Sequence, residues 1–339
     1  MNNTDEVVCV LPNFIKIVKN NNYGYTLEST KFVKNGSVVY TGNFYNIPNN
    51  NKLYKLIIKS SDDKNILTFE NIGNKNTVKE NENTRNLYTF DGFMNHSCNH
   101  NTISSETRTT SIPNCFEYDQ IAVKDIHEGD EITCNYLHFD YECDGHTFDC
   151  LCGSTNCYRK ISGFKNCTLK QQLELLPHVD EIMFEQFKKE NNDILFKNIS
   201  FENKNVDIFV NNNSFWGIKS KKTFMKDEIV IENNIEQIPL DKKVLLNVSN
   251  KYILLDNDIH FTRQESCYEY YGIETFTNHS CNPNCSHILI TDSTYQMKAL
   301  REIKEGEEIT CDYNNFQTNY DVKPFTCLCG YEHCKGIIY

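Results

Sequence analysis

The chain contains two copies of the same set of short motifs, and this duplication limits its possible folds more than any other feature. The segment 95–101 (NHSCNHN) returns at 278–284 (NHSCNPN), and the segment 128–136 (EGDEITCNY) returns at 305–313 (EGEEITCDY). Self-similarity at a long, nearly constant period is typical of duplicated structural units. The sequence therefore predicts two copies of one domain.

A cluster of three cysteines follows the motifs in each copy, with the spacing C-x-C-x4-C. The two clusters are Cys150, Cys152 and Cys157, and Cys327, Cys329 and Cys334. Three thiolates at this spacing supply three corners of a zinc tetrahedron, so a fourth ligand must come from elsewhere. Three buried cysteines without a metal are the alternative, but the repetition of the same spacing favours zinc.

Composition and charge exclude several classes of function. The chain has 34 Lys and Arg residues against 46 Asp and Glu, a net charge of −12, which argues against strong nucleic-acid binding and suits a basic protein partner. No apolar run approaches the roughly 20 residues of a membrane-spanning helix. The first residues lack the basic segment of a signal peptide, and 16 cysteines without such a signal favour metal ligands over disulfides. We therefore expect an intracellular protein that is neither secreted nor bound to a membrane.

The repeated residues leave few options for catalysis. His96 and Ser97 are adjacent and cannot form a nucleophile–base pair. The chain has only 14 glycines and no glycine-rich phosphate loop, and the acidic segment 128–131 resembles a turn that enters a strand. The tyrosine that ends the second motif, Tyr136 or Tyr313, remains as the candidate, because a phenol can orient an amine by hydrogen bonding.

The three motifs, in this order, resemble those of the SET-domain protein lysine methyltransferases that carry a post-SET zinc module. The resemblance covers both halves of the chain and implies an α+β, mainly β fold. The two tandem SET folds would be small twisted sheets with a pseudoknot, each followed by a four-cysteine zinc post-SET segment and joined by a short helical connector. The implied domains are a first SET domain (11–137), a first post-SET module (147–164), the connector (165–200), a second SET domain (203–314) and a second post-SET module (324–339).

Two short helices are predicted in the connector. Thr168 is a typical N-cap for a helix over 168–176, and Pro177 is expected to end it. A second helix over 180–190 carries apolar side chains spaced for one buried face, namely Ile182, Met183, Phe184 and Phe187. We expect these helices to pack on the first copy.

The resemblance also assigns roles to individual residues. It implies S-adenosylmethionine as methyl donor, and Tyr313 and Tyr136 as catalytic residues whose hydroxyls point at the transferred methyl. The implied cofactor-binding residues are Trp216, Gly217, Asn278 and His279 in the second copy, and Tyr23, Gly24, Asn95 and His96 in the first. Two zinc ions would be bound, one by Cys98, Cys150, Cys152 and Cys157, the other by Cys281, Cys327, Cys329 and Cys334.

The two copies depart from the family pattern to different degrees. Both lack the first glycine of the G-x-G that usually opens the family's cofactor site. The first copy also has His100 where the second has Pro283, and Asn135 where the second has Asp312. We therefore expect the second copy to be the catalyst, with the first active, weakened or kept for packing and docking.

A basic protein, foremost a histone tail, is the substrate that the resemblance implies, with a nuclear or chromatin location. A non-histone protein is an alternative substrate, and a catalytically inactive tandem module that binds peptides is an alternative of another class. Direct nucleic-acid binding by two zinc knuckles fits poorly with the net charge of −12. The sequence leaves open the target lysine, the number of methyl groups and the oligomeric state.

Overall fold

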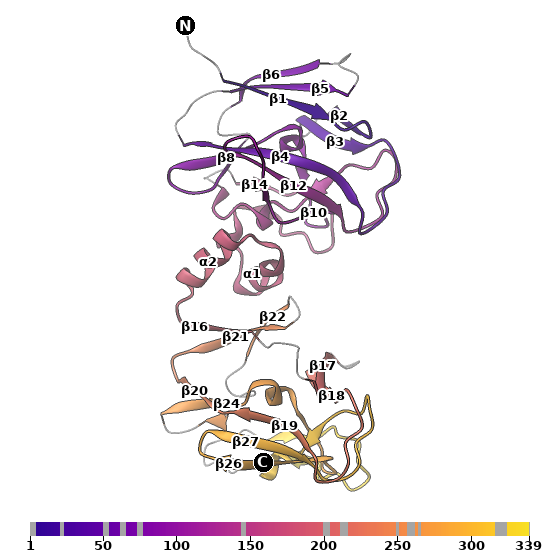
Figure 1. Ribbon diagram of the computed structural model, residues 1–339, viewed down its shortest axis with the longest axis vertical. Coiled ribbons are helices and arrows are strands. Elements are labelled where there is room, and N and C mark those ends of the chain that lie inside the picture. Colours follow the sequence, from indigo (N-terminus) through magenta and orange to yellow (C-terminus); the bar gives the residue numbers. More distant parts are fainter. Residues whose placement is uncertain are drawn as a thin grey trace. The chain divides into compact units, whose positions relative to one another are not determined.

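The computed structural model divides the chain into two compact units, Met1–Phe187 and Lys188–Tyr339, each described here by itself (Figure 1). Both units are mostly β-structure, with few and short helices. In the part of the chain that the structure describes, no helix is long and apolar enough to cross a membrane. The described residues are 5–20, 24–49, 54–61, 66–72, 77–143, 147–198, 204–210, 216–248, 251–255, 262–263, 266–315 and 324–338.

The first unit is built from small sheets. One has the order β1-β5-β6, in which β1 (Asp5–Leu11) is parallel to β5 (Tyr54–Ser60) and β6 (Ile66–Ile72) is antiparallel to β5. Another has the order β10-β12-β4-β8-β7, with β11 also beside β12; its strands are β4 (Val38–Pro48), β7 (Thr77–Lys79), β8 (Thr84–Tyr88), β10 (Thr102–Ser104), β11 (Arg108–Thr109) and β12 (Cys115–Ala122). Two-stranded pairs are formed by β2 (Ile15–Asn20) with β3 (Gly24–Ser29), β9 (Asn95–His96) with β13 (Thr133–Cys134), and β14 (Phe148–Asp149) with β15 (Lys160–Ile161).

The second unit repeats much of this arrangement. Its sheet β16-β21-β22 again begins with a parallel pair, β16 (Ile194–Asn198) with β21 (Lys243–Val248), followed by the antiparallel β22 (Lys251–Leu254). The remaining strands form the sheets β19-β27-β26 and β20-β24-β23 and the pairs β17–β18, β25–β28 and β29–β30. Their bounds are β17 (Val206–Val210), β18 (Trp216–Ser220), β19 (Ile229–Asn234), β20 (Glu236–Pro239), β23 (Thr262–Arg263), β24 (Cys267–Tyr270), β25 (Asn278–His279), β26 (Cys285–Thr291), β27 (Thr294–Ala299), β28 (Thr310–Cys311), β29 (Phe325–Thr326) and β30 (Ile337–Ile338).

Each unit has its own hydrophobic core, and the fully buried positions recur between the two. Four side chains in each unit have no exposed surface. They are Leu27, Val39, Ile126 and Ile132 in the first unit, and Ile218, Val230, Ile303 and Ile309 at the corresponding positions of the second. Since β-branched and leucine side chains at these positions fill the space between the small sheets, burial of the same set stabilises each unit separately.

The predicted connector helices are present; α1 (Leu169–Leu175) lies in the first unit, and the boundary between the units falls after Phe187, near the end of α2 (Glu181–Glu190). Helix α1 begins with a capping box in which the Thr168 side chain accepts from the Gln171 backbone, as the sequence predicts. A 3₁₀ helix, η6 (Leu176–His178), contains Pro177 and directly follows α1. Gln172 of α1 also donates to the Phe164 carbonyl at 3.1 Å, which ties the helix to the segment before it.

Helix α2 (Glu181–Glu190) differs from the prediction at one position. Met183 and Phe187 are buried, and the Phe187 ring contacts that of Phe164 edge-to-face with centroids 5.9 Å apart. Ile182, however, is 54% exposed, so its assignment to the buried face is wrong. Because Met183 and Phe187 are four residues apart they share one helix face, whereas a residue next to Met183 points about 100° away.

Replacing Phe187 by alanine should destabilise the first unit by about 3–5 kcal/mol, because it removes a fully buried ring and leaves a cavity beside Phe164. Ile182→Ala on the same helix is the matched control and should change the free energy of unfolding by no more than about 0.5 kcal/mol, since that side chain is exposed. Urea unfolding followed by circular dichroism measures both. Equal losses for the two variants would contradict the packing described for α2.

Candidate active site

The two repeated motifs meet as neighbouring parallel strands in both units. In the first unit β9 lies beside β13, with Asn95 opposite Thr133 and His96 opposite Cys134. In the second unit β25 lies beside β28 in the same register. In each unit the Asn-His pair therefore lies directly beside the strand that precedes the candidate tyrosine, so that the two motifs can contribute to one active site.

The histidine of each pair links the tyrosine to the cysteine cluster. The His96 Nδ1 atom accepts a hydrogen bond from the Tyr136 backbone N–H at 3.1 Å, and its Nε2 atom lies 3.2 Å from the Cys98 Sγ. In the second unit the corresponding distances around His279 are 3.1 Å and 3.3 Å. Burial lowers the pKa of His96 to about 4, so the ring is neutral and its Nε2–H donates to the sulfur.

This arrangement restricts how the histidine can contact a cofactor. A neutral imidazole has one donor and one acceptor nitrogen, and both are already used. The sequence-based assignment of His96 and His279 to cofactor binding therefore leaves only their backbone atoms and ring carbons for that role. The ring nitrogens instead hold the tyrosine backbone and the cysteine cluster together.

The candidate catalytic tyrosines have fixed and buried hydroxyl groups. Tyr136 Oη donates to the carbonyl of Met94 at 2.8 Å, and Tyr313 Oη donates to the carbonyl of Thr277 at 2.6 Å. Burial raises the pKa of both phenols above their usual range. Each hydroxyl therefore stays protonated, and its lone pairs can accept a hydrogen bond without the phenol acting as a base.

A close backbone approach marks the predicted cofactor site of the second unit. The Asn278 side chain donates to the Trp216 carbonyl at 3.0 Å and to Glu308 Oε1 at 2.7 Å. A Cβ atom at Gly217 would lie 2.9 Å from Glu308 Oε1 and 3.0 Å from Asn278 Nδ2. Both distances are tighter than Cβ atoms normally make, so a larger residue at this position would require the neighbouring side chains to shift, and glycine leaves the backbone uncovered.

The first unit fills the corresponding place with a side chain. Asn95 Nδ2 lies 2.8 Å from Glu131 Oε1 and 3.5 Å from the carbonyl of Tyr25, so Tyr25 takes the position that Trp216 has in the other unit. The next residue is Thr26, whose hydroxyl also donates to Glu131. A threonine therefore stands where the second unit has Gly217.

This register corrects one sequence-based equivalence. The dipeptide Tyr23-Gly24 resembles Trp216-Gly217, but Gly24 has φ +86°, and a Cβ atom added there would meet nothing within 4 Å, unlike one at the crowded Gly217. Tyr23 lies outside the described residues. The match fails because a second aromatic residue, Tyr25, follows two positions later and is the one that pairs with the Asn95 side chain.

The two four-cysteine groups assemble as the sequence predicts. In each group the four Sγ atoms lie within 4.8 Å of one another, and the groups are Cys98, Cys150, Cys152 and Cys157, and Cys281, Cys327, Cys329 and Cys334. The Sγ atoms of Cys98 and Cys150 are 3.7 Å apart, and those of Cys281 and Cys327 are 3.8 Å apart. Zn–S bonds of about 2.3 Å in a tetrahedron separate the sulfurs by about 3.8 Å, so the geometry fits zinc.

Backbone N–H groups donate hydrogen bonds to these sulfurs and so stabilise the negatively charged thiolate form. The N–H groups of Tyr158 and Lys335 each point at the fourth ligand of their cluster, at 3.3 Å from the Sγ of Cys98 and Cys281 respectively. The Cys281 amide and other hydrogen bonds lower the pKa of Cys329 to about 6, which favours the thiolate at neutral pH. A thiolate is the form that binds zinc.

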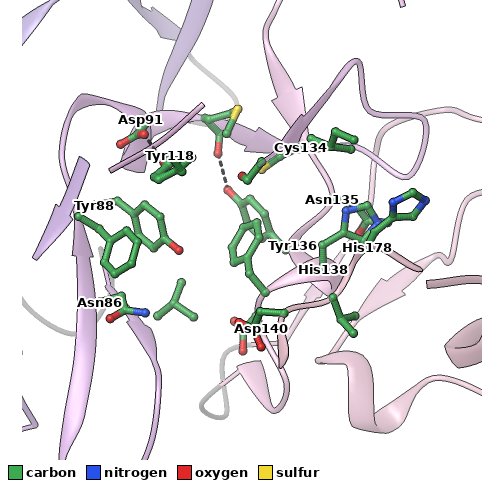
Figure 2. A pocket seen from close by; sticks show the side chains of 18 of the residues that line it. Asn86, Tyr88, Asp91, Tyr118, Cys134, Asn135, Tyr136, His138, Asp140 and His178 are labelled. Carbon is green, nitrogen blue, oxygen red and sulfur yellow. Dashed lines mark hydrogen bonds between the residues drawn. The ribbon is translucent and has the colours of Figure 1, made fainter. Parts of the chain in front are cut away.

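A cavity of about 960 Å³ adjoins Tyr136 in the first unit (Figure 2). Figure 2 shows the Tyr136 ring in its middle, with Tyr88, Tyr118 and Asp91 along one side and His138 on another. Connector residues 177–181 also line it. The cavity is therefore shaped partly by the segment that follows the cysteine cluster, which the motifs alone did not indicate.

Sequence reasoning missed two buried acids that precede the Asn-His pairs. Asp91 and Glu274 stand at the same place in the two copies, four residues before Asn95 and Asn278, and are only 4% and 5% exposed. The signal was present, because an acidic residue recurs at this position within an apolar surrounding (FDGFM and IETFT). Repeated charge inside a buried segment favours a specific role over solvation.

Comparisons with known proteins agree with this geometry. The SET domain family model matches residues 8–137 and 215–314. The chain is 26% identical over 171 residues to a "Histone-lysine N-methyltransferase, H3 lysine-4 specific" of Chaetomium globosum, covering 47% of this chain and 14% of that protein. It is 30% identical over 153 residues to the histone-lysine N-methyltransferase SETD1B of Homo sapiens, covering 42% and 8%.

A solved structure gives a weaker match. The methyltransferase domain of human histone-lysine N-methyltransferase SETMAR is 18% identical and has a TM-score of 0.27, covering 39% of this chain and 56% of that one. A TM-score this low adds no support to the fold. The chain spans 14% or less of the length of these curated relatives.

The purified chain should hold two zinc ions per molecule, and Cys98→Ser or Cys281→Ser should each reduce this to one, because each removes a ligand from one closed site. Cys267→Ser, outside both groups, is the matched control and should retain two. Elemental analysis by mass spectrometry, normalised to protein concentration, measures the content. Zinc content that is the same in all four proteins would show that these thiols do not bind it.

Proposed function

The chain belongs to the SET domain family, and from this premise we propose that it transfers methyl groups from S-adenosylmethionine to the side-chain amine of lysine in a basic protein, foremost a histone tail. The observation that carries the proposal is the anchored tyrosine hydroxyl beside the Asn-His strand, formed by Tyr313 on Thr277. A net charge of −12 suits a basic substrate. The histone-lysine methyltransferase names of the relatives point to the same substrate class.

The residues of the chain would act mainly by positioning. S-adenosylmethionine, when bound, supplies an electrophilic methyl group on a sulfonium. The crowded backbone at Gly217 and the side chain of Asn278, held by Glu308, fit a ligand that approaches the main chain closely. The Tyr313 hydroxyl, whose proton is committed to the Thr277 carbonyl, directs its lone pairs at the incoming amine or methyl.

We assign catalysis to the second unit. Gly217 leaves its backbone accessible, whereas Thr26 fills the corresponding place and bonds Glu131. Asp312, which precedes Tyr313, accepts from Lys335 Nζ at 3.1 Å, while Asn135 in the first unit only caps a 3₁₀ helix, η3 (Tyr136–His138). The same observations favour a second role for the first unit, in which its cavity binds protein without transferring a methyl group.

The buried Cys311 stands two residues before Tyr313, where many family members have an aromatic residue. Its thiol is smaller than an aromatic ring, and it is 2% exposed. We propose that the space it leaves admits an amine that already carries a methyl group, so that the product is not limited to monomethyl-lysine.

Tyr313→Phe should reduce methyl transfer by about 100-fold or more, because it removes the hydroxyl that orients the reacting groups. Tyr136→Phe is the matched variant in the first unit and should reduce methyl transfer much less. Incorporation of labelled methyl from S-adenosylmethionine into core histones measures both. Label found only in other proteins of a lysate would show that the substrate is not a histone. A larger loss of methyl transfer from Tyr136→Phe than from Tyr313→Phe would reverse the assignment of catalysis to the second unit.

Gly217→Ala should weaken cofactor binding to the second unit by more than 10-fold, because a Cβ atom there meets Glu308 and Phe209 at 2.9 Å. Gly92→Ala is the matched control, since its Cβ would meet only the Tyr88 Cβ at an ordinary 3.6 Å. Isothermal titration with S-adenosylmethionine should give about one site per chain for the wild type and for the control. Unchanged binding by Gly217→Ala would contradict the proposed location of the cofactor.

A further inference from the structure

Four aromatic side chains that retain accessible surface line the cavity of the first unit. Tyr88, Phe139 and Tyr136 are half-buried, and Phe148 is exposed. The ring centroids are 6.1 Å apart for Tyr88 and Phe139, 5.7 Å for Phe139 and Tyr136, and 6.0 Å for Tyr136 and Phe148. Because neighbouring ring planes are inclined to one another by 45°, 53° and 73°, the four rings form a concave wall and not a flat stack.

A wall of this kind attracts a cation. The face of an aromatic ring carries a negative electrostatic potential, and a cation within about 6 Å of the ring centroid is attracted to it. At the spacings found here, one cation between two inclined rings lies within that distance of both. Several rings around one cation are the arrangement by which proteins bind quaternary ammonium groups.

The charged side chains around the rings add to this attraction. Figure 2 shows Asp91 on one side of the Tyr136 ring and Asp140 close below it. The lining contains five acids against two bases, and burial lowers the pKa of His138 to about 2, so that this histidine adds no positive charge. The acids are Asp91, Glu106, Asp140, Asp180 and Glu181, and the bases are Lys79 and Arg85.

The acids nearest to the rings already accept hydrogen bonds from the protein. The Asp91 carboxylate accepts from the Tyr118 hydroxyl and, at 3.4 Å, from the Thr89 hydroxyl. Asp140 Oδ1 accepts from the Cys143 backbone N–H at 2.7 Å. A primary ammonium has three N–H donors that need acceptors when it leaves water, whereas a trimethylammonium has none. The cavity therefore offers charge and aromatic surface more than hydrogen-bond sites, which favours a methylated ammonium.

The same unit is poorly suited to methylate what it binds. Thr26 stands where the second unit has Gly217, and its hydroxyl donates to Glu131. The Tyr136 hydroxyl, which lies in the aromatic wall, donates to the Met94 carbonyl at 2.8 Å and is held in place by it. A lysine side chain that enters the cavity therefore meets a fixed aromatic surface, while the place for a methyl donor is narrowed.

We propose that the first unit is a recognition site that binds dimethyl- or trimethyl-lysine of a protein in this aromatic cavity; the inference rests on the function proposed above, because the second unit would produce such a lysine. The cavity holds the methylated ammonium by its charge and releases it unchanged. A chain that both makes and binds this modification stays near a protein that it has already methylated. The local concentration of further lysines is then raised at the second unit.

The test compares the binding of two capped amino acids, N-acetyl-trimethyl-lysine amide and N-acetyl-lysine amide, to the zinc-loaded full chain without a methyl donor. Saturation-transfer NMR of the ligand protons, followed as a titration, measures both affinities. We expect the trimethylated form to bind at least about 10-fold more tightly. Tyr88→Leu and Phe139→Leu should each weaken its binding by about 10-fold, because each removes a ring of the wall. Tyr88→Phe, which keeps the ring, should bind like the wild type.

Phe32→Leu is the matched control, since that ring belongs to the same unit, is 54% exposed and lies outside the cavity; it should bind like the wild type. Zinc content and circular dichroism verify that each variant is folded. Equal affinities for the two amino acids, or wild-type affinity in both leucine variants of the wall, would overturn the inference. A chain that binds trimethyl-lysine as expected but incorporates no labelled methyl group into histones or lysate proteins would instead overturn the proposed function, and with it the claim that the ligand is the chain's own product.

Discussion

The histidine that joins the tyrosine strand to the cysteine cluster is the contact on which the rest of each site depends. His96 receives the Tyr136 amide on one ring nitrogen and faces the Cys98 sulfur with the other, and His279 does the same in the second unit. A donor pointed at a thiolate makes a charge-assisted hydrogen bond, which fixes the ring orientation. The cysteine cluster is therefore linked through the histidine to the tyrosine backbone, so a metal bound by the cysteines would influence the position of the candidate catalytic group.

Features that depend on short spacing could be predicted from the sequence. The three-cysteine clusters and the capped helix after Thr168 are found where expected, because each needs only a few residues in a fixed pattern. The fourth ligands Cys98 and Cys281 are also found where expected, but they lie 52 and 46 residues before the cysteines that they meet and were indicated only by the family resemblance. Features that depend on long-range pairing could not. Tyr25 is identified as the counterpart of Trp216 only by its contact with Asn95, seventy residues further along the chain.

Three of the differences between the two units bear on the proposal that the second is the catalyst. A glycine lies under the predicted cofactor position in the second unit and a threonine in the first. An aspartate that pairs with Lys335 precedes the second tyrosine, while an asparagine precedes the first. The buried acid accepts a hydrogen bond from a tyrosine hydroxyl in the first unit, whereas in the described part of the second unit the corresponding tyrosine donates to a backbone carbonyl. In the first unit the threonine fills the space that the glycine leaves, and the tyrosine satisfies the buried acid.

The third difference shows how little is needed to change the state of a buried acid. Both units place a tyrosine beside the carboxyl group, on β12 in the first unit and on β27 in the second, so composition alone does not distinguish them. Tyr118 directs its single proton at Asp91, whereas Tyr295 directs its own at a backbone carbonyl. Burial raises the pKa of Asp91 only to about 6 but that of Glu274 to about 8. Because a hydrogen bond to a carboxylate stabilises its charged form, donation from Tyr118 keeps the pKa of Asp91 closer to its usual range than the pKa of Glu274, whose neighbour Tyr295 donates to the Tyr271 carbonyl.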